Sequence, residues 1–121
     1  MLPKFNSKVF LAPMMNITDA SFRLLCKENG AGLVYTELKS IHSIIAKKDK
    51  IKEFIEFSEK ERPIAVQLFC NDKELLVKAA KIVEPYFDII DYNMGCPSPK
   101  ITRQEAGAIL LQKPEKVKEL L

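Results

Sequence analysis

Short, almost uninterrupted apolar segments recur along the chain at residues 9–12, 33–36, 64–69 and 87–93. Strands covered on both faces, as in a parallel sheet, are apolar along their whole length, whereas half-exposed strands alternate apolar and polar residues. The pattern therefore predicts a parallel sheet with one strand at each of these places.

The segment after the first strand carries apolar residues at helical spacing. Phe22, Leu25 and Cys26 stand at i, i+3 and i+4, which predicts a helix that buries these three side chains. Thr18 is a suitable N-cap, and the Asn29-Gly30 pair is a suitable stop.

Later segments repeat this helical pattern. Residues 41–45 and 51–55 predict two short helices, and Asn71 with Glu74 resembles a capping box ahead of a longer helix that ends at Pro85. Pro114 suits the first turn of a last helix. Strands and helices thus alternate along the chain, which predicts an α/β fold with right-handed crossovers.

Two architectures satisfy this alternation, a doubly wound open sheet and part of a (β/α)₈ barrel. A complete barrel needs about 250 residues, whereas this chain has 121. The chain also ends at Leu120-Leu121 inside an amphipathic pattern, with no stop signal and nothing afterwards to cover its apolar face. We therefore expect residues 1–121 to form the N-terminal half of a barrel, with about four βα units.

The amino-acid composition excludes some classes of protein but does not identify a function. Hydrophobic residues make up 47% and charged residues 29%, and no apolar run reaches the roughly 20 residues that span a membrane. With no signal peptide at the start, cytoplasmic residence is expected. The net charge of +3 permits a nucleic-acid partner without requiring one. The single histidine and three separated cysteines predict neither a metal site nor a disulfide, and Cys26 and Cys70 are expected as small core residues.

Unusual polar residues stand where the predicted strands end, and in parallel α/β folds functional groups gather there. Gln67 interrupts the third apolar run, and Asp91 and Asn93 share one face of the fourth strand. Cys96 follows in a loop between Gly95 and Pro97, where an exposed thiol is expected. These side chains are the candidates for chemistry.

The same segments resemble the motifs of the dihydrouridine synthase family. Residues 12–19, APMMNITD, resemble its A-P-M-x-G-[VI]-T-D opening, and Thr36-Glu37 and residues 66–68, VQL, resemble its second and third strand motifs. Residues 91–97, DYNMGCP, resemble its most specific block, D-[IL]-N-x-G-C-P. The motifs occur in the family's order from about residue 9 to residue 121.

The resemblance implies an FMN-dependent barrel enzyme that reduces uridine in tRNA to 5,6-dihydrouridine, with NAD(P)H as the reductant. It implies these roles for residues of this chain: FMN contacts for Pro13, Met14, Met15 and Gln67, contacts to uracil or RNA for Asn93, Lys100 and Arg103, and proton donation to C5 for Cys96. A thiol suits that last role because its ordinary pKa of about 8.5 leaves it protonated at neutral pH.

The chain departs from the family pattern in two ways. Asn16 stands where the family usually has glycine, and asparagine tolerates the left-handed backbone better than most residues. The family's later flavin contacts would lie after Leu121, so the exposed sheet edge is expected to pair with a complementary C-terminal half or with itself. Two other functions remain open, an inert half-barrel that binds RNA or a partner, and a flavin enzyme that reduces a free pyrimidine, similar to dihydroorotate dehydrogenases.

Overall fold

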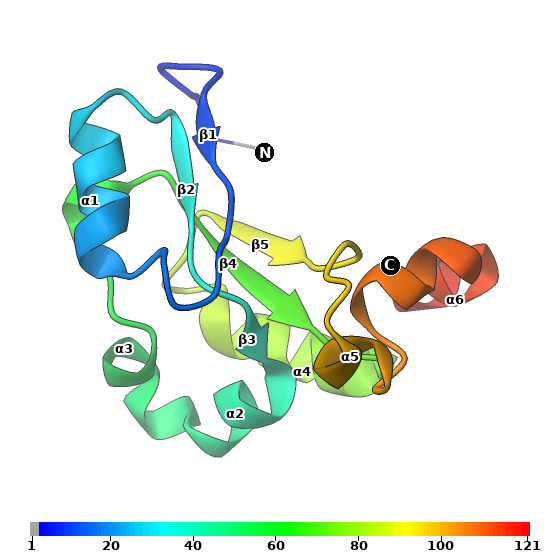
Figure 1. Ribbon diagram of the computed structural model, residues 1–121. Coiled ribbons are helices and arrows are strands. Elements are labelled where there is room, and N and C mark those ends of the chain that lie inside the picture. The colour runs from blue at the N-terminus through cyan, green and yellow to red at the C-terminus, as the bar shows by residue number, and fades with distance from the viewer. Residues whose placement is uncertain (1–2) are drawn as a thin grey trace.

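The computed structural model describes residues 3–121, which form one parallel sheet with helices packed against it (Figure 1). The strands are β1 (Phe10–Leu11), β2 (Leu33–Tyr35), β3 (Lys39–Ser40), β4 (Ile64–Phe69) and β5 (Ile89–Tyr92). The α-helices are α1 (Ala20–Glu28), α2 (Ile41–Ala46), α3 (Ile51–Phe54), α4 (Lys73–Val83), α5 (Pro99–Thr102) and α6 (Pro114–Leu120). Short 3₁₀ helices are η1 (Lys48–Lys50), η2 (Glu59–Glu61) and η3 (Gly107–Gln112).

The order of the strands distinguishes the two architectures that the sequence left open. β1 pairs with β2, β2 with β4, and β4 with β5, all in parallel. β3 pairs with the end of β4 on the same edge as β2, because β5 occupies the other edge over the same residues. The strands therefore lie side by side in chain order, as in a (β/α)₈ barrel, without the reversal of a doubly wound sheet. The fold is α/β and matches part of a barrel.

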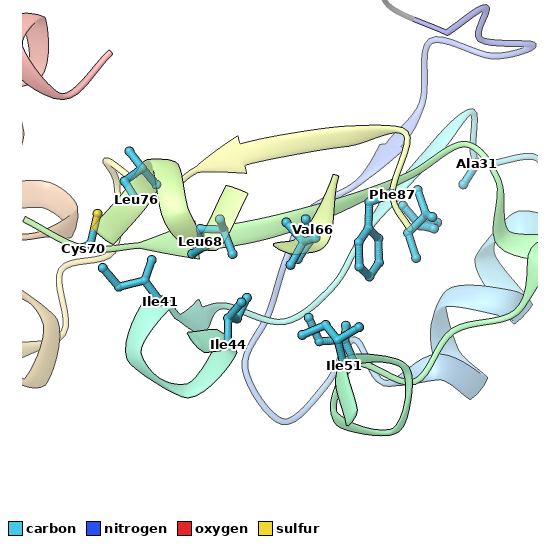
Figure 2. Close-up of a cluster of buried hydrophobic side chains, with 14 residues drawn as sticks. Ala31, Ile41, Ile44, Ile51, Val66, Leu68, Cys70, Leu76 and Phe87 are labelled. Carbon is cyan, nitrogen blue, oxygen red and sulfur yellow. The ribbon is translucent and has the colours of Figure 1, made fainter. Parts of the chain in front are cut away.

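The core lies between one face of the sheet and the helices (Figure 2). Val66 and Leu68 of β4 point to this face and meet Ile41 and Ile44 of α2. α4 contributes Leu76, Ala79 and Val83 to the same cluster. Since alternate residues of a strand point to opposite faces, Gln67 belongs to the other face.

The first helix is capped and buried differently from the prediction. Asp19, not Thr18, is the N-cap, and its Oδ1 accepts the Phe22 N–H at 2.8 Å. Leu25 was predicted to be buried but is 53% exposed, whereas Arg23 is only 3% exposed. The reason is a polar contact with the segment before β4, where Arg23 Nε donates to Glu61 Oε2 at 2.6 Å.

Several other predictions were approximately right in position. The N-cap of α4 is Asp72 rather than Asn71, because the Asp72 side chain accepts the Leu75 N–H at 2.9 Å. α6 begins at Pro114 as predicted. α6 contacts the earlier elements α4 and η3, and Leu120 is buried whereas Leu121 is 75% exposed. β1 and β5 are shorter than predicted, and β3 was not predicted.

Candidate functional site

A chain of side-chain hydrogen bonds joins the carboxyl ends of β4 and β5. Gln67 lies opposite Asp91 in the sheet register, and its Nε2 donates to Asp91 Oδ2 at 2.6 Å. Its Oε1 accepts from Asn93 Nδ2 at 2.9 Å. The expectation that Asp91 and Asn93 share one face is therefore confirmed, and Gln67 lies on that face too, with Tyr92 of β5 packed on the opposite, core side.

Asn93 also fixes the loop that carries Cys96. Its Oδ1 accepts the backbone N–H groups of Gly95 at 3.2 Å and Cys96 at 2.9 Å. The Cys96 carbonyl oxygen accepts the Ala108 N–H at 2.9 Å. Both polar backbone atoms of Cys96 are therefore held, one through the Gln67 network and the other through η3.

Gly107 allows η3 to approach this loop closely. Its φ is +68°, and a Cβ atom built on it would lie 2.5 Å from the Cys96 carbonyl oxygen and 2.9 Å from Ile101 Cγ2. An L side chain rarely adopts such a φ, and no carbon atom fits at 2.5 Å from an oxygen. Glycine is therefore required here to hold the Cys96 carbonyl in place.

The Cys96 side chain is partly exposed and lines a cavity of about 630 Å³. Met15 from the loop after β1 and Lys100 from α5 line the same cavity. Phe69 and Ile101, which pack against Cys96, line the cavity as well. The structure therefore brings together three of the site residues proposed from the sequence, Cys96, Met15 and Lys100.

The loop after β1 has a defined conformation. Asn16 has a φ of +60°, so the prediction that asparagine would adopt the left-handed backbone at this position is confirmed. Its N–H donates to Glu37 Oε1 at 2.5 Å. Thr18 Oγ1 accepts the Met14 N–H at 3.1 Å. Glu37 and Thr18 thus fix the segment that presents the exposed Met14 and Met15 side chains.

Other proposed residues lie apart from this cavity. Pro13 lines a separate hollow of about 320 Å³ with Tyr35 and Asp91, on the face of the sheet that carries Gln67. Burial, and then the negative charge of Asp91, raises the pKa of Tyr35 above its ordinary value, so the phenol stays protonated there. Arg103 is exposed beside α5 and lines neither space.

Cys70 is not a second reactive thiol at the site. It is 6% exposed and belongs to the core cluster, as predicted (Figure 2). Its carbonyl oxygen accepts the Tyr92 hydroxyl at 2.8 Å. Burial raises the pKa of the Cys70 thiol, which disfavours the thiolate form.

Sequence reasoning missed the residues that position the others. Ala108 acts through its backbone N–H, which any residue except proline carries, so no sequence signal could identify it. Glu37 was noted in the second-strand motif, but its contact with Asn16, 21 residues earlier, was not predicted. Among residues 3–121, no cluster of histidine, cysteine, aspartate and glutamate could hold a metal ion. Over the same range, no helix has the length and apolar character needed to cross a membrane.

Comparison with known proteins gives one consistent result. The model of the dihydrouridine synthase family matches residues 10–121. The tRNA-dihydrouridine synthase B proteins of Pasteurella multocida and Escherichia coli are 40% and 39% identical to the chain over 119 residues. The protein of the same name from Shewanella oneidensis is 37% identical. Each match covers 98% of this chain but only 36% or 37% of the relative. The chain belongs to the dihydrouridine synthase family.

Proposed function

We propose that the chain supplies the Cys96 side of the active site of an FMN-dependent enzyme that reduces uridine in tRNA to 5,6-dihydrouridine. The partly exposed thiol in the cavity shared with Met15 and Lys100 is the observation that carries this proposal. Family membership and the relatives named tRNA-dihydrouridine synthase B support the reaction and the tRNA substrate.

The residues present fit one part of an FMN site. Met14 and Met15 expose apolar side chains, 37% and 54% respectively, that suit contact with a flat aromatic ring. Gln67 keeps a second N–H and a second lone pair beyond its two observed bonds, so its amide can still bind the polar edge of a ring. Pro13 lines the separate hollow beside Tyr35. We assign FMN contacts to Pro13, Met14, Met15 and Gln67 on these grounds.

The role of Cys96 follows from the charge balance of the reaction. Bound FMN, once reduced by NAD(P)H, would supply the hydride for C6 of uracil. The substrate then carries an enolate, and the Cys96 thiol transfers its proton to C5, which completes the saturated bond. The resulting thiolate regains a proton from water. A positioned acid of this kind contributes about 10²–10⁴-fold in rate.

Asn93 positions the thiol of Cys96 through the loop that carries it. Because Asn93 Oδ1 is already used by the N–H groups of Gly95 and Cys96, its main task is to fix the loop. Uracil contact by Asn93 then uses the remaining N–H of its amide. Lys100 and Arg103 are assigned to substrate approach, Lys100 inside the cavity and Arg103 at the surface beside it.

A complementary C-terminal part completes the site in this proposal. Among residues 3–121, β1 and β5 each have a partner strand on one edge only. Ile90 of β5 lies opposite Val66 of β4, on the face of the sheet against which the helices pack, yet it is 37% exposed. Both features support pairing of this half with another half-barrel, in the same protein or in a partner.

Replacement of Cys96 by alanine tests the function. We expect Cys96→Ala in the complete protein to lower dihydrouridine formation in tRNA by about 10²–10⁴-fold, with flavin absorbance unchanged. Cys26→Ala, which removes a half-buried thiol on α1, serves as the matched control and keeps full turnover. Unchanged turnover in Cys96→Ala would contradict the proposal. Reduction of a free pyrimidine in place of tRNA would favour a dihydroorotate dehydrogenase-like activity instead.

A further inference from the structure

The cavity beside Cys96 has a distinct charge pattern. Lys39 from β3 and Lys100 from α5 line it, and none of its lining residues is acidic. The chain as a whole has 16 aspartates and glutamates against 19 lysines and arginines. A cavity lined by two lysines and no carboxylate therefore favours an anionic ligand.

The same cavity is lined by serine hydroxyls that form no hydrogen bond as donor or cap among residues 3–121. Ser40 precedes α2 and Ser98 precedes α5, and both occupy the N-cap position. Serine at this position usually accepts a hydrogen bond from the first turn of the helix. Neither side chain does so here. With Ser43 of α2, they leave three hydroxyls available to a ligand.

The two lysines differ in how they are held. Lys39 Nζ lies 3.6 Å from Glu37 Oε2 and 5.5 Å from the centre of the Phe54 ring, so its position is fixed while other N–H donors remain available. Glu37 is not part of the cavity wall, and its other oxygen holds the Asn16 N–H. Lys100 is exposed and forms no ion pair within residues 3–121.

We propose that this cavity is a subsite for the phosphate-bearing nucleotide next to the target base of the RNA strand. The inference rests on the proposed function, in which the reacting uracil lies next to Cys96, and Cys96 lines the same cavity. Ammonium and hydroxyl donors match phosphate oxygens, and Phe54 and Phe69 offer apolar surface to the sugar or base. A volume of about 630 Å³ exceeds what one pyrimidine ring needs and lies in the usual range of ligand pockets.

The salt dependence of RNA binding tests the subsite. The affinity of the complete protein for an unmodified tRNA transcript is measured by fluorescence anisotropy across a series of salt concentrations. Each phosphate contact contributes about 0.7–0.9 to the slope of log affinity against log salt. We expect Lys39→Gln and Lys100→Gln each to weaken binding several-fold and to lower this slope by about that amount.

Lys81→Gln is the matched control, because it removes the same charge from the last turn of α4, outside the cavity lining. An equal loss of slope in Lys81→Gln, or no loss in Lys39→Gln and Lys100→Gln, would overturn the subsite. A raised KM for the nicotinamide cofactor with unchanged tRNA affinity would also overturn it, since the phosphates would then be those of the cofactor. Failure of the wild-type protein to form dihydrouridine would instead overturn the proposed function.

Discussion

Three glycines form a natural series for measuring how tightly the Cys96 loop is held. Gly107 has a φ of +68° and would place a Cβ against the Cys96 carbonyl. Gly30 has a φ of +93° but nothing within 4 Å of the added atom. Gly95 has neither a left-handed backbone nor a close neighbour. Alanine therefore introduces backbone strain and a steric clash at Gly107, backbone strain alone at Gly30, and neither at Gly95.

The expected free energies follow from these geometries. A left-handed backbone costs an L residue about 1–2 kcal/mol, and forcing an extra carbon into a packed region costs about 1–3 kcal/mol more. We expect Gly107→Ala to lose about 2–5 kcal/mol of unfolding free energy, and Gly30→Ala about 1–2 kcal/mol. Gly95→Ala should be neutral or slightly stabilising, because alanine restricts the unfolded chain.

Urea unfolding of the three variants measures these differences. With a slope of about 2 kcal/mol per molar urea, a difference of about 2 kcal/mol between Gly107→Ala and Gly30→Ala lowers the midpoint by about 1 M. Turnover should fall in Gly107→Ala and remain in Gly30→Ala, because only the first displaces Cys96. Equal midpoints for these two variants would refute the argument that η3 and the Cys96 carbonyl are in tight contact.

Two further predictions concern buried groups. Glu61→Ala leaves Arg23 buried without its partner and should lower the unfolding free energy by about 3–5 kcal/mol in urea denaturation. Glu59→Ala, which removes an exposed carboxylate, should have a much smaller effect, and a similar loss in both would contradict the burial argument. Because burial raises the pKa of Cys70 and the thiolate is the reactive form, alkylation of Cys70 followed by mass spectrometry should be slow at about pH 8 and accelerate at higher pH. Rapid labelling at about pH 8 would show that this thiol is accessible in the folded protein.

The sequence predicted the parts of the fold that depend on local pattern. The four apolar runs became β1, β2, β4 and β5, and Asn16 adopted the left-handed backbone expected of asparagine. The buried face of α1 could not be predicted, because Arg23 is buried by Glu61, which lies 38 residues later. β3 was missed because it has two residues and exists through its pairing with Leu68 and Phe69.

The candidate site was predictable to a similar extent. Strand alternation placed Asp91 and Asn93 on one face, and the structure links both of them to Gln67. The motif likewise placed Cys96 in an accessible loop. The hydrogen bond from the Ala108 N–H to the Cys96 carbonyl oxygen depends on how η3 packs against the loop. This is a tertiary contact that no local sequence pattern indicates.

The lateral order of the strands has a consequence for how the polypeptide is made. β2, β4 and β5 each pair with a strand of the unit synthesised just before them, so each of these segments finds its docking edge already formed as it leaves the ribosome. Loop closure then spans one β–α unit at a time, which keeps the entropic barrier low. We expect the nascent protein to assemble in steps from β1 towards β5, with the growing edge always the most recently translated strand.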